Sequence, residues 1–197
     1  SSDLGILKSG LAFQNCDVAI VTNISADHIG LGGIDSMEQM AKVKAVVPET
    51  VFKHGYAILN AEDDLVYNMR KGLDCNIALF SMDENNPRII EHCKGGGYAA
   101  VFENGYITIM KGTWKIRVIK VSDVPVTYGG KALHNIMNCL PAVLSTYFWR
   151  NIELEDIRLA LQTFVPSAVQ TPGRLNMFQF KQFKFLVDFA HNPAGLE

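Results

Sequence analysis

The segment from Asp17 to Lys44 constrains the fold more than any other part of this sequence. It opens with an apolar run over 17–23 that is short and rich in β-branched residues, as is typical of a buried strand in an α/β sheet. A polar and then glycine-rich loop over 25–33 follows, and a helix is predicted to begin near Ser36, with Ser36 or Asp35 as its N-cap. Because open α/β sheets bind ligands where their strands end, this loop is a candidate for a site.

Two further apolar stretches extend the same pattern. Residues 56–60 and 76–80 are predicted to be strands. Between them, Asp63 or Asp64 is expected to cap a helix that runs to about Lys71. Strands that alternate with helices in this way predict a parallel, doubly wound sheet.

The pattern changes from Tyr98 onward, where strand-like runs are separated by a turn signal instead of by helices. Residues 98–103 and 106–110 flank Asn104-Gly105, which is a strong signal for a β-hairpin with a type I′ turn. Residues 114–121 alternate with period two and should add a third antiparallel strand with one face in water. The basic residues of that strand are interpreted as a solvated face rather than as a site for an anionic ligand.

Helical patterns return beyond this region. Residues 132–140 form an apolar helical segment that Pro141 is expected to break or bend. A second, amphipathic helix is predicted over 153–164. The stretch 171–174 has the composition of a linker corner, and a last strand is predicted over 185–188.

Taken alone, the polar residues at these corners are ambiguous. Asp27-His28 follows the first strand, but such a pair is more often a hydrogen-bonded turn than a metal site, and Mg²⁺ takes few protein ligands. Lys44 can equally be a solvated lysine on a helix face. Capping and function weigh equally at Asn60, and His134-Asn135 suits a helix cap with a buried imidazole. For Arg174 the alternative is an exposed turn arginine.

Composition excludes several classes of protein. Of the 197 residues, 48% are hydrophobic and 19% are charged, as in ordinary globular proteins. The formal net charge of −2 and the pI near 6.2 lack the basic footprint of nucleic-acid-binding proteins. No apolar run approaches a membrane-spanning length and no signal peptide opens the sequence, which predicts a soluble, cytoplasmic protein without membrane partners. The four cysteines lack C-x-x-C spacing and are expected to be reduced thiols.

A series of motifs, taken in chain order, resembles the signature of the Mur ligase family. The motifs are Thr22–Ile24, Asp27-His28, Ala41–Lys44, Asn60–Asp64, G-x-x-x-H-N-x-x-N over Gly130–Asn138, Pro172–Arg174 and Asp188–Pro193. The resemblance implies an α/β fold like the Mur ligase central domain, with a mostly parallel, doubly wound sheet and a small antiparallel β-sheet insertion. It also implies that 1–167 is this ATP-binding domain, truncated at its N-terminus, and that 168–197 is a linker and the start of the C-terminal domain.

In that family a loop histidine binds Mg²⁺, and a lysine of the following helix, often carbamylated, supports the metal site. The resemblance places these roles at His28 and Lys44, which are thereby implied to be both metal-binding and catalytic. Alignment of Ser36–Glu38 with the start of the family's helix selects Lys44 rather than Lys42.

The same resemblance implies that ATP is the nucleotide and assigns its contacts. Asn135 would contact the adenine, with His134 beside it, and Asn60 would lie near the nucleotide. Arg174 would reach the phosphates, a role that suits a bidentate donor that is always charged. Asp188 would bind the ribose.

Two stretches, 5–36 and 172–195, look closest to the branch of the family that makes cyanophycin. The cell-wall ligases usually carry D-H-L-D-x-H, whereas Gly30 and Gly32 stand at the later places here. The implied enzyme uses ATP to phosphorylate a carboxylate, and then joins arginine to aspartate side chains of a poly-aspartate or cyanophycin polymer. The alternatives are a peptidoglycan Mur ligase that acts on UDP-muramoyl peptides and a non-catalytic Mur-like scaffold module.

The sequence contains no G-x-x-x-x-G-K-[ST] phosphate loop, and the family's catalytic glutamate would lie before Ser1. The chain is therefore expected to be a fragment of a larger enzyme and to be inactive alone. The resemblance implies that the full-length enzyme is a homo-oligomer.

Overall fold

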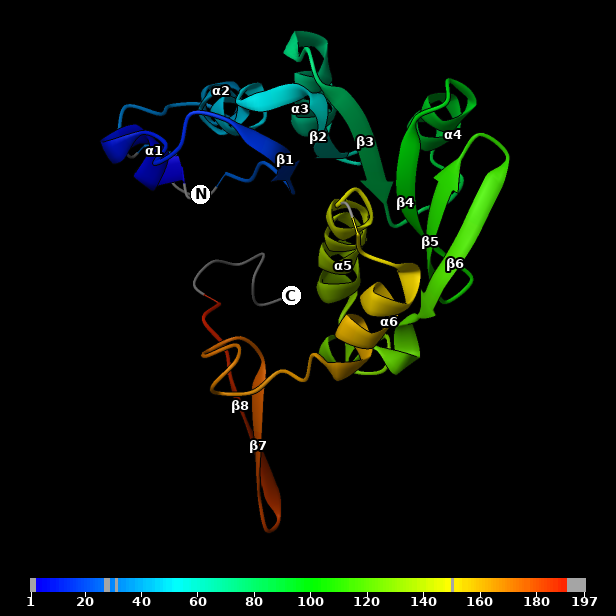
Figure 1. Ribbon diagram of the computed structural model, residues 1–197. Helices are drawn as coiled ribbons and strands as arrows, with labels where there is room; N and C mark the ends of the chain where they lie inside the picture. The colour runs from blue at the N-terminus through cyan, green and yellow to red at the C-terminus, as the bar shows by residue number, and fades with distance from the viewer. Residues whose placement is uncertain (1–2, 27–28, 31, 150, 191–197) are drawn as a thin grey trace.

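The computed structural model of this protein describes residues 3–26, 29–30, 32–149 and 151–190. A six-stranded sheet in the order β1-β2-β3-β4-β5-β6 carries helices on both faces, and β7-β8 form a separate two-stranded sheet (Figure 1). The strands are β1 (Cys16–Val21), β2 (Val51–Asn60), β3 (Asn76–Ser81), β4 (Tyr98–Glu103), β5 (Tyr106–Lys111), β6 (Trp114–Lys120), β7 (Asn176–Phe180) and β8 (Phe183–Val187). The α-helices are α1 (Asp3–Ser9), α2 (Met37–Glu49), α3 (Asp64–Met69), α4 (Pro87–Lys94), α5 (Leu133–Tyr147) and α6 (Leu154–Thr163). The short 3₁₀ helices are η1 (Arg70–Gly72), η2 (Val121–Asp123) and η3 (Pro125–Thr127).

The parallel half of the sheet is formed by β1 to β4. Each of these strands pairs in parallel with the next, so their carboxyl ends meet at one edge. β2 is longer than predicted, because it begins at Val51, which pairs with Cys16, and not at Tyr56. The prediction was wrong here because Lys53 and His54 interrupt the apolar pattern. Backbone pairing with β1 extends the strand without apolar side chains.

β5 and β6 continue this sheet in antiparallel orientation from the edge at β4. Asn104 and Gly105 have φ values of 50° and 84°, and a type I′ turn requires a positive φ at both central positions. The predicted hairpin and the third antiparallel strand are therefore both present. They form one continuous sheet with the parallel half.

Each face of the sheet is covered by its own hydrophobic core. On one face, helices α2, α3 and α4 pack against the sheet through buried residues that include Met40, Val66, Ile89, Leu59, Leu79 and Val101. On the other face, helices α5 and α6 do so through buried residues that include Ile136, Leu140, Leu144, Ile157, Ile58, Phe80 and Ile109. A sheet with helices on both faces is what the doubly wound prediction requires, so the predicted fold class is confirmed (Figure 1).

The starts of two helices agree with the sequence signals. Ser36 caps α2 by accepting a hydrogen bond from the amide of Gln39 at 3.2 Å. Asp63, rather than Asp64, caps α3. Among the described residues, no helix is long and apolar enough to cross a membrane, and all four cysteines are free thiols.

α5 passes through Pro141 as one helix, so of the two predicted outcomes, a break or a bend, the break is wrong. Pro141 has no N–H to donate to the carbonyl one turn earlier, which disfavours a helix interior. However, Pro141 is buried, as are Leu140 and Leu144 on either side of it. Packing of this apolar face on the sheet outweighs the loss of one hydrogen bond.

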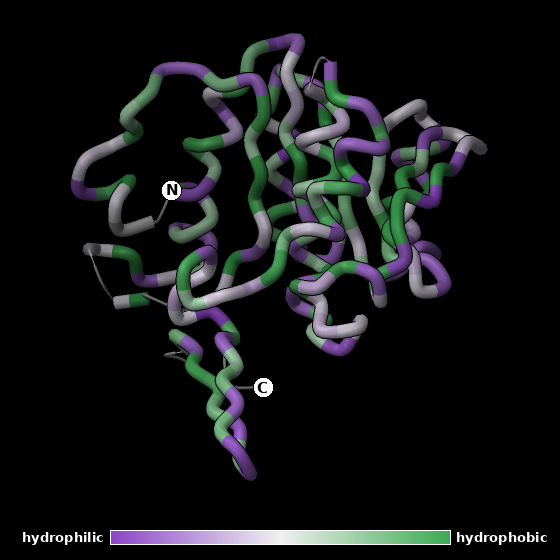
Figure 2. Tube along the Cα trace, turned by 60° about the horizontal axis from the view of Figure 1, so that its bottom comes forward, coloured by the Kyte–Doolittle hydropathy of each residue, from purple (hydrophilic) through white to green (hydrophobic). Residues whose placement is uncertain are grey.

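β7 and β8 form a hairpin that projects away from the main sheet (Figures 1 and 2). β8 overlaps the predicted strand at 185–188, whereas β7 was not predicted. The apolar side chains of the hairpin are exposed: Met177, Phe178, Phe180, Phe183, Phe185, Leu186 and Val187. Two strands that have only each other cannot bury side chains on either face.

A cluster of charged side chains lies across β4, β5 and β6. Glu103 is 6% exposed and accepts hydrogen bonds from Lys115 Nζ at 2.6 Å and from Thr108 Oγ1 at 3.1 Å. Arg117 lies 3.6 Å from the same carboxylate, and Lys115 also reaches Glu84 at 3.3 Å. The basic side chains are partly exposed, in agreement with the prediction of a solvated strand face, and they also neutralise the buried carboxylate of Glu103.

Candidate functional site

α5 is oriented so that its N-terminus lies at the edge where the parallel strands end. Its C-cap, Phe148, stacks on Tyr56 with ring centroids 3.7 Å apart and meets Tyr98 edge-on at 5.3 Å. Tyr56 and Tyr98 mark the opposite edge, because Tyr98 begins β4 and Tyr56 pairs with the first residue of β3. The first turn of α5, with His134 and Asn135, therefore lies at the carboxyl edge, where β2 also ends.

Asn60 ends β2 with a side chain that is almost fully buried. Its Nδ2 donates to the carbonyl of Thr22 at 2.8 Å, and its Oδ1 accepts from the amide of Glu62 at 2.8 Å. Both ends of the carboxamide are thus bound within the protein, one to the loop after β1 and the other to the corner before α3. This geometry supports a structural role for Asn60 in holding that loop.

Lys44 extends from α2 toward the same loop. Its Nζ donates to the carbonyl of Asn23 at 3.2 Å, and the residue is half-buried, whereas Lys42 on the same helix is exposed. Of the two lysines, Lys44 is therefore the one that contacts the loop after β1. The chain continues from this loop to His28, which lies outside the described residues.

Lys44 can serve as a ligand of Mg²⁺ in only one chemical form. An ammonium group repels a cation, whereas a carbamate offers the oxygen ligands that Mg²⁺ prefers. Carbamylation leaves one N–H on Nζ, so the bond to the carbonyl of Asn23 is compatible with the modified side chain. Within the part of the chain that the structure describes, no group of three or more histidine, cysteine, aspartate or glutamate side chains could hold a metal ion.

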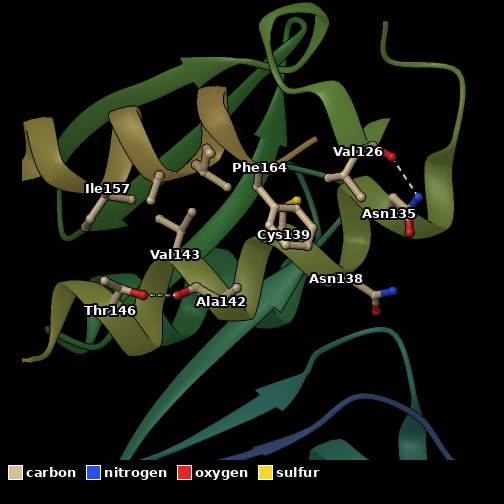
Figure 3. A pocket seen from close by; sticks show the side chains of 11 residues that line it. Val126, Asn135, Asn138, Cys139, Ala142, Val143, Thr146, Ile157 and Phe164 are labelled. Atoms are coloured by element: carbon tan, nitrogen blue, oxygen red, sulfur yellow. Dashed lines mark hydrogen bonds between the residues drawn. The ribbon is translucent and has the colours of Figure 1, made fainter. Parts of the chain in front are cut away.

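The first turn of α5 presents polar side chains at the edge. Asn135 Nδ2 donates to the carbonyl of Val126 at 2.7 Å, which fastens η3 to the start of the helix (Figure 3). His134 and Asn138 are exposed. The imidazole of His134 is therefore not the buried group of the plain interpretation, and it faces solvent at the edge of the sheet.

A cavity of about 400 Å³ lies between α5 and α6 beside these residues (Figure 3). Its lining is mostly apolar, with Leu161 from α6 and Phe164 at the C-cap of that helix, and the carboxamides of Asn135 and Asn138 add polar groups. Burial beside this cavity raises the pKa of the Cys139 thiol to about 11. Apolar walls with a few amide groups are typical of pockets for small organic ligands. The cavity depends on how α5 and α6 pack against each other, so no local sequence pattern predicts it.

The corner before β7 holds Arg174, and Asp188 directly follows β8. The carboxylate of Asp188 accepts hydrogen bonds from two backbone amides, one of them that of Leu175, each at 2.7 Å. The guanidinium carbon of Arg174 lies 5.3 Å from the centroid of the Phe189 ring. The hydroxyl of Tyr128 donates to the carbonyl of Leu175 and so ties this corner to the turn before α5.

The predicted site residues thus form three local groups. Lys44 and Asn60 bind the loop after β1, His134 and Asn135 share the first turn of α5, and Arg174 and Asp188 share the corner at the hairpin. Tyr128, which links two of these groups, was missed, because nothing in its local sequence marks a tyrosine that reaches a distant carbonyl. Binding of ATP or Mg²⁺ by these residues stays a prediction.

Residues 1–146 match the family model for the Mur ligase middle domain. The chain belongs to the Mur ligase family. The family assignment made from its motifs is therefore confirmed.

Curated relatives within the Mur ligase family include cyanophycin synthetases. That of Geminocystis herdmanii is 51% identical over 191 residues, and that of Synechocystis sp. is 49% identical over 191 residues. Each of these alignments covers 97% of this chain and 22% of the relative, so the chain spans about a fifth of their length. The UDP-N-acetylmuramate–L-alanine ligase of Acetivibrio thermocellus is 26% identical over 188 residues, which cover 91% of this chain and 35% of that protein.

Solved structures of other Mur ligases share the fold. MurF from Acinetobacter baumannii superposes with a TM-score of 0.60 at 21% sequence identity, over 91% of this chain and 35% of MurF. A murein peptide ligase from Psychrobacter arcticus gives a TM-score of 0.54 at 16% identity, over 92% of this chain and 33% of the ligase. At these identities the likeness establishes the fold alone.

Proposed function

We propose that this chain is part of an ATP-dependent ligase that makes cyanophycin by joining arginine to aspartate side chains of a poly-aspartate backbone. The observation that carries this proposal is the 46–51% identity to five cyanophycin synthetases over 97–98% of the chain. Three cell-wall ligases among the relatives are 22–26% identical. Gly30 and Gly32, at places where cell-wall enzymes usually carry an aspartate and a histidine, support the same choice.

The proposed reaction forms an isopeptide bond in two steps. A carboxylate oxygen of an aspartate side chain attacks the terminal phosphorus of ATP, and ADP leaves, which produces an acyl phosphate. The amine of arginine then attacks the acyl carbon, inorganic phosphate leaves, and the nitrogen loses a proton to give the amide. Bound Mg²⁺ supplies charge stabilisation for the transferring phosphoryl group.

We assign His28 and Lys44 to the metal, with Lys44 in its carbamylated form. The bond from Lys44 Nζ to the carbonyl of Asn23 supports this assignment, because it directs the lysine to the loop after β1 and remains available after carbamylation. Asn60 contributes by holding the same loop through Thr22. These residues then place the metal at the edge where the parallel strands end.

For the nucleotide, we assign Asn135 and His134 to the adenine, Arg174 to the phosphates and Asp188 to the ribose. The apolar cavity beside the first turn of α5 supports an adenine site there, since a purine needs apolar walls and a few amide partners. The link from Tyr128 to the corner at Arg174 and Asp188 supports a site shared between that corner and α5.

We further propose that 1–167 is the central domain and that 168–197 begins a second one. α6 packs against α5 and β6, whereas β7 and β8 form a sheet of their own with exposed apolar side chains. A cytoplasmic homo-oligomer that binds ATP, arginine and the polymer is part of the same proposal. The 197-residue chain by itself should show no arginine ligation, because it holds no phosphate loop.

The proposal is tested by ADP release from the whole protein that carries this chain. The reaction holds ATP, Mg²⁺ and an aspartate-primed cyanophycin-like peptide, with and without arginine. His28→Ala is compared with His54→Ala, which removes an exposed imidazole elsewhere. Lys44→Ala is compared with Lys42→Ala on the same helix.

We expect arginine-dependent ADP release that is lost in His28→Ala and Lys44→Ala and retained in both control variants. Turnover on a UDP-muramoyl peptide without any response to arginine would instead assign the chain to cell-wall synthesis. A folded whole protein that releases no ADP with either substrate would indicate a non-catalytic scaffold.

A further inference from the structure

Side chains from three separate elements hold the backbone that follows β1. Asn60, at the end of β2, donates to the carbonyl of Thr22 at 2.8 Å, and Lys44, from α2, donates to the carbonyl of Asn23 at 3.2 Å. Asp63, the N-cap of α3, accepts a hydrogen bond from the amide of Ile24 at 2.6 Å. Three consecutive backbone positions, 22–24, are therefore each bound by a different side chain. We call this arrangement the 22–24 clamp.

Asp63 divides its carboxylate between the clamp and a helix. Oδ2 accepts from the amide of Ile24, while Oδ1 accepts from the amides of Leu65 and Val66, both at 3.0 Å, in the first turn of α3. A carboxylate has two acceptor oxygens and can serve both partners, whereas a carboxamide has only one. The residue at this position must therefore be an acidic one if the helix cap and the bond to Ile24 are to coexist.

The clamp acts on a segment whose side chains are partly exposed. Thr22 and Asn23 are exposed, whereas Ile24 is 7% exposed and packs in the core with Ile34 and Met40. The side chain of Ile24 thus fixes the depth of this segment, and its hydrogen bond to Asp63 fixes the direction of the backbone. The peptide unit between Asn23 and Ile24 is held at both ends, its N–H by Asp63 and its carbonyl by Lys44, which is the lysine assigned to the metal.

We infer that Asp63 is a positioning residue for the proposed metal site, which it controls through the amide of Ile24 rather than by contact with metal or nucleotide. The inference rests on the proposed function, because it concerns how well the protein uses Mg²⁺. Capping of α3 would by itself explain an aspartate at this position, so the inference gives Asp63 a second role. Charge-assisted hydrogen bonds are about twice as strong as neutral ones, so one such bond suffices to bias the backbone.

Two variants separate the clamp from the helix cap. Asp63→Asn keeps the size of the side chain and one acceptor oxygen, so it can cap α3 or bind Ile24 but not both. Asp63→Ser also caps a helix well but is too short to reach Ile24, and it serves if the asparagine variant does not fold. The matched control is Asp64→Asn, which removes the same charge one residue later, where the carboxylate pairs with Arg88 and not with the clamp.

The first measurement is hydrogen exchange at the amide of Ile24. We expect exchange to be at least ~10-fold faster in Asp63→Asn or Asp63→Ser than in the parent protein, because a hydrogen bond to a charged group is lost. Exchange should be unchanged in Asp64→Asn. An Ile24 amide that exchanges at the parent rate in both Asp63 variants would overturn the inference.

The second measurement is the Mg²⁺ concentration that gives half-maximal ADP release by the whole protein. We expect this concentration to rise at least ~5-fold in the Asp63 variants and to stay unchanged in Asp64→Asn, measured at a temperature at which every variant is fully folded. Faster exchange at Ile24 together with an unchanged Mg²⁺ requirement would show that the clamp is only structural and overturn the positioning role. A parent protein without any ADP release refutes the proposed function itself, and the exchange data distinguish that outcome from a failure of the clamp.

Discussion

Replacing Glu103 by glutamine is expected to destabilise the protein and to change how its stability depends on pH. Glu103 is nearly buried and receives hydrogen bonds from Lys115 and Thr108. The hydrogen bond from Lys115 is the largest cause that lowers the pKa of Glu103 from its ordinary 4.5 to about 2. Burial opposes this effect, and a second positive charge is supplied by Arg117 at 3.6 Å.

The size of the effect follows from that pKa. Lowering the pKa by about 2.5 corresponds to a ceiling of about 3 kcal/mol of stability near neutral pH. The side chains of Lys115 and Arg117 are 41% and 56% exposed, so water screens part of the attraction. We therefore expect Glu103→Gln to lower the free energy of unfolding by about 1–2 kcal/mol at pH 7.

The sign of the pH dependence is fixed by the direction of the pKa. Because the folded state holds the carboxylate below its ordinary pKa, the stabilisation is complete above about pH 4.5 and is lost as the pH falls toward about 2. The difference in stability between the parent and Glu103→Gln should therefore shrink across this window. Urea unfolding followed at pH 7, 4 and 3 measures it.

The control for this experiment is Glu155→Gln. Glu155 pairs with Arg158 on the surface of α6, and its side chain is 76% exposed, so its loss should cost no more than about 0.5 kcal/mol. Equal losses for Glu103→Gln and Glu155→Gln at pH 7 would refute the reasoning. So would a difference between the parent and Glu103→Gln that stays constant down to pH 3.

Two further predictions concern packing. Gly97→Ala should lower the free energy of unfolding by about 1–3 kcal/mol, because a Cβ there would lie 2.2 Å from His92 Nε2, whereas Gly72→Ala, which meets open space, should change it by less than about 1 kcal/mol in urea unfolding. The Cys139 thiol, with its pKa raised from 9.0 to about 11, should hold about 100-fold less thiolate at pH 8 than an unperturbed thiol and react with iodoacetamide at least that much more slowly, as mass spectrometry of the labelled peptide would show. Rapid labelling of Cys139 in the folded protein would contradict the burial seen here.

Sequence reasoning reached most of the fold through signals that act over a few residues. Asn104-Gly105 needs positive φ at both positions, and it predicted the turn between β4 and β5 for that reason. Ser36, one of the two residues predicted to cap α2, is its N-cap, and a cap can be predicted because it depends on amides only a few residues away. The errors came where distant partners decide. β2 extends to Val51 because β1 pairs with it, and α5 continues through Pro141 because its buried face packs on the sheet.

For the candidate site, the sequence likewise identified residues but not their contacts. The motifs that carry the family resemblance lie in the sequence as short runs, so Lys44, Asn60 and Asn135 could be singled out without a structure. Their contacts could not, because each contact joins residues on different elements, as when Lys44 reaches the carbonyl of Asn23 and Asp63 the amide of Ile24.

Short-range signals thus identified the family, the alternation of strands and helices in the sheet and the residue types at its carboxyl edge, whereas α4 and β7 were not predicted. Packing between separate elements, in contrast, determines which of these side chains bind the loop after β1, where the cavity between α5 and α6 lies, and how Glu103 is neutralised. The two groups of features differ in the distance along the chain over which their interactions act. Helix caps and turns are set by neighbours along the chain, whereas clamps, cavities and buried ion pairs form only when packing brings separate elements together.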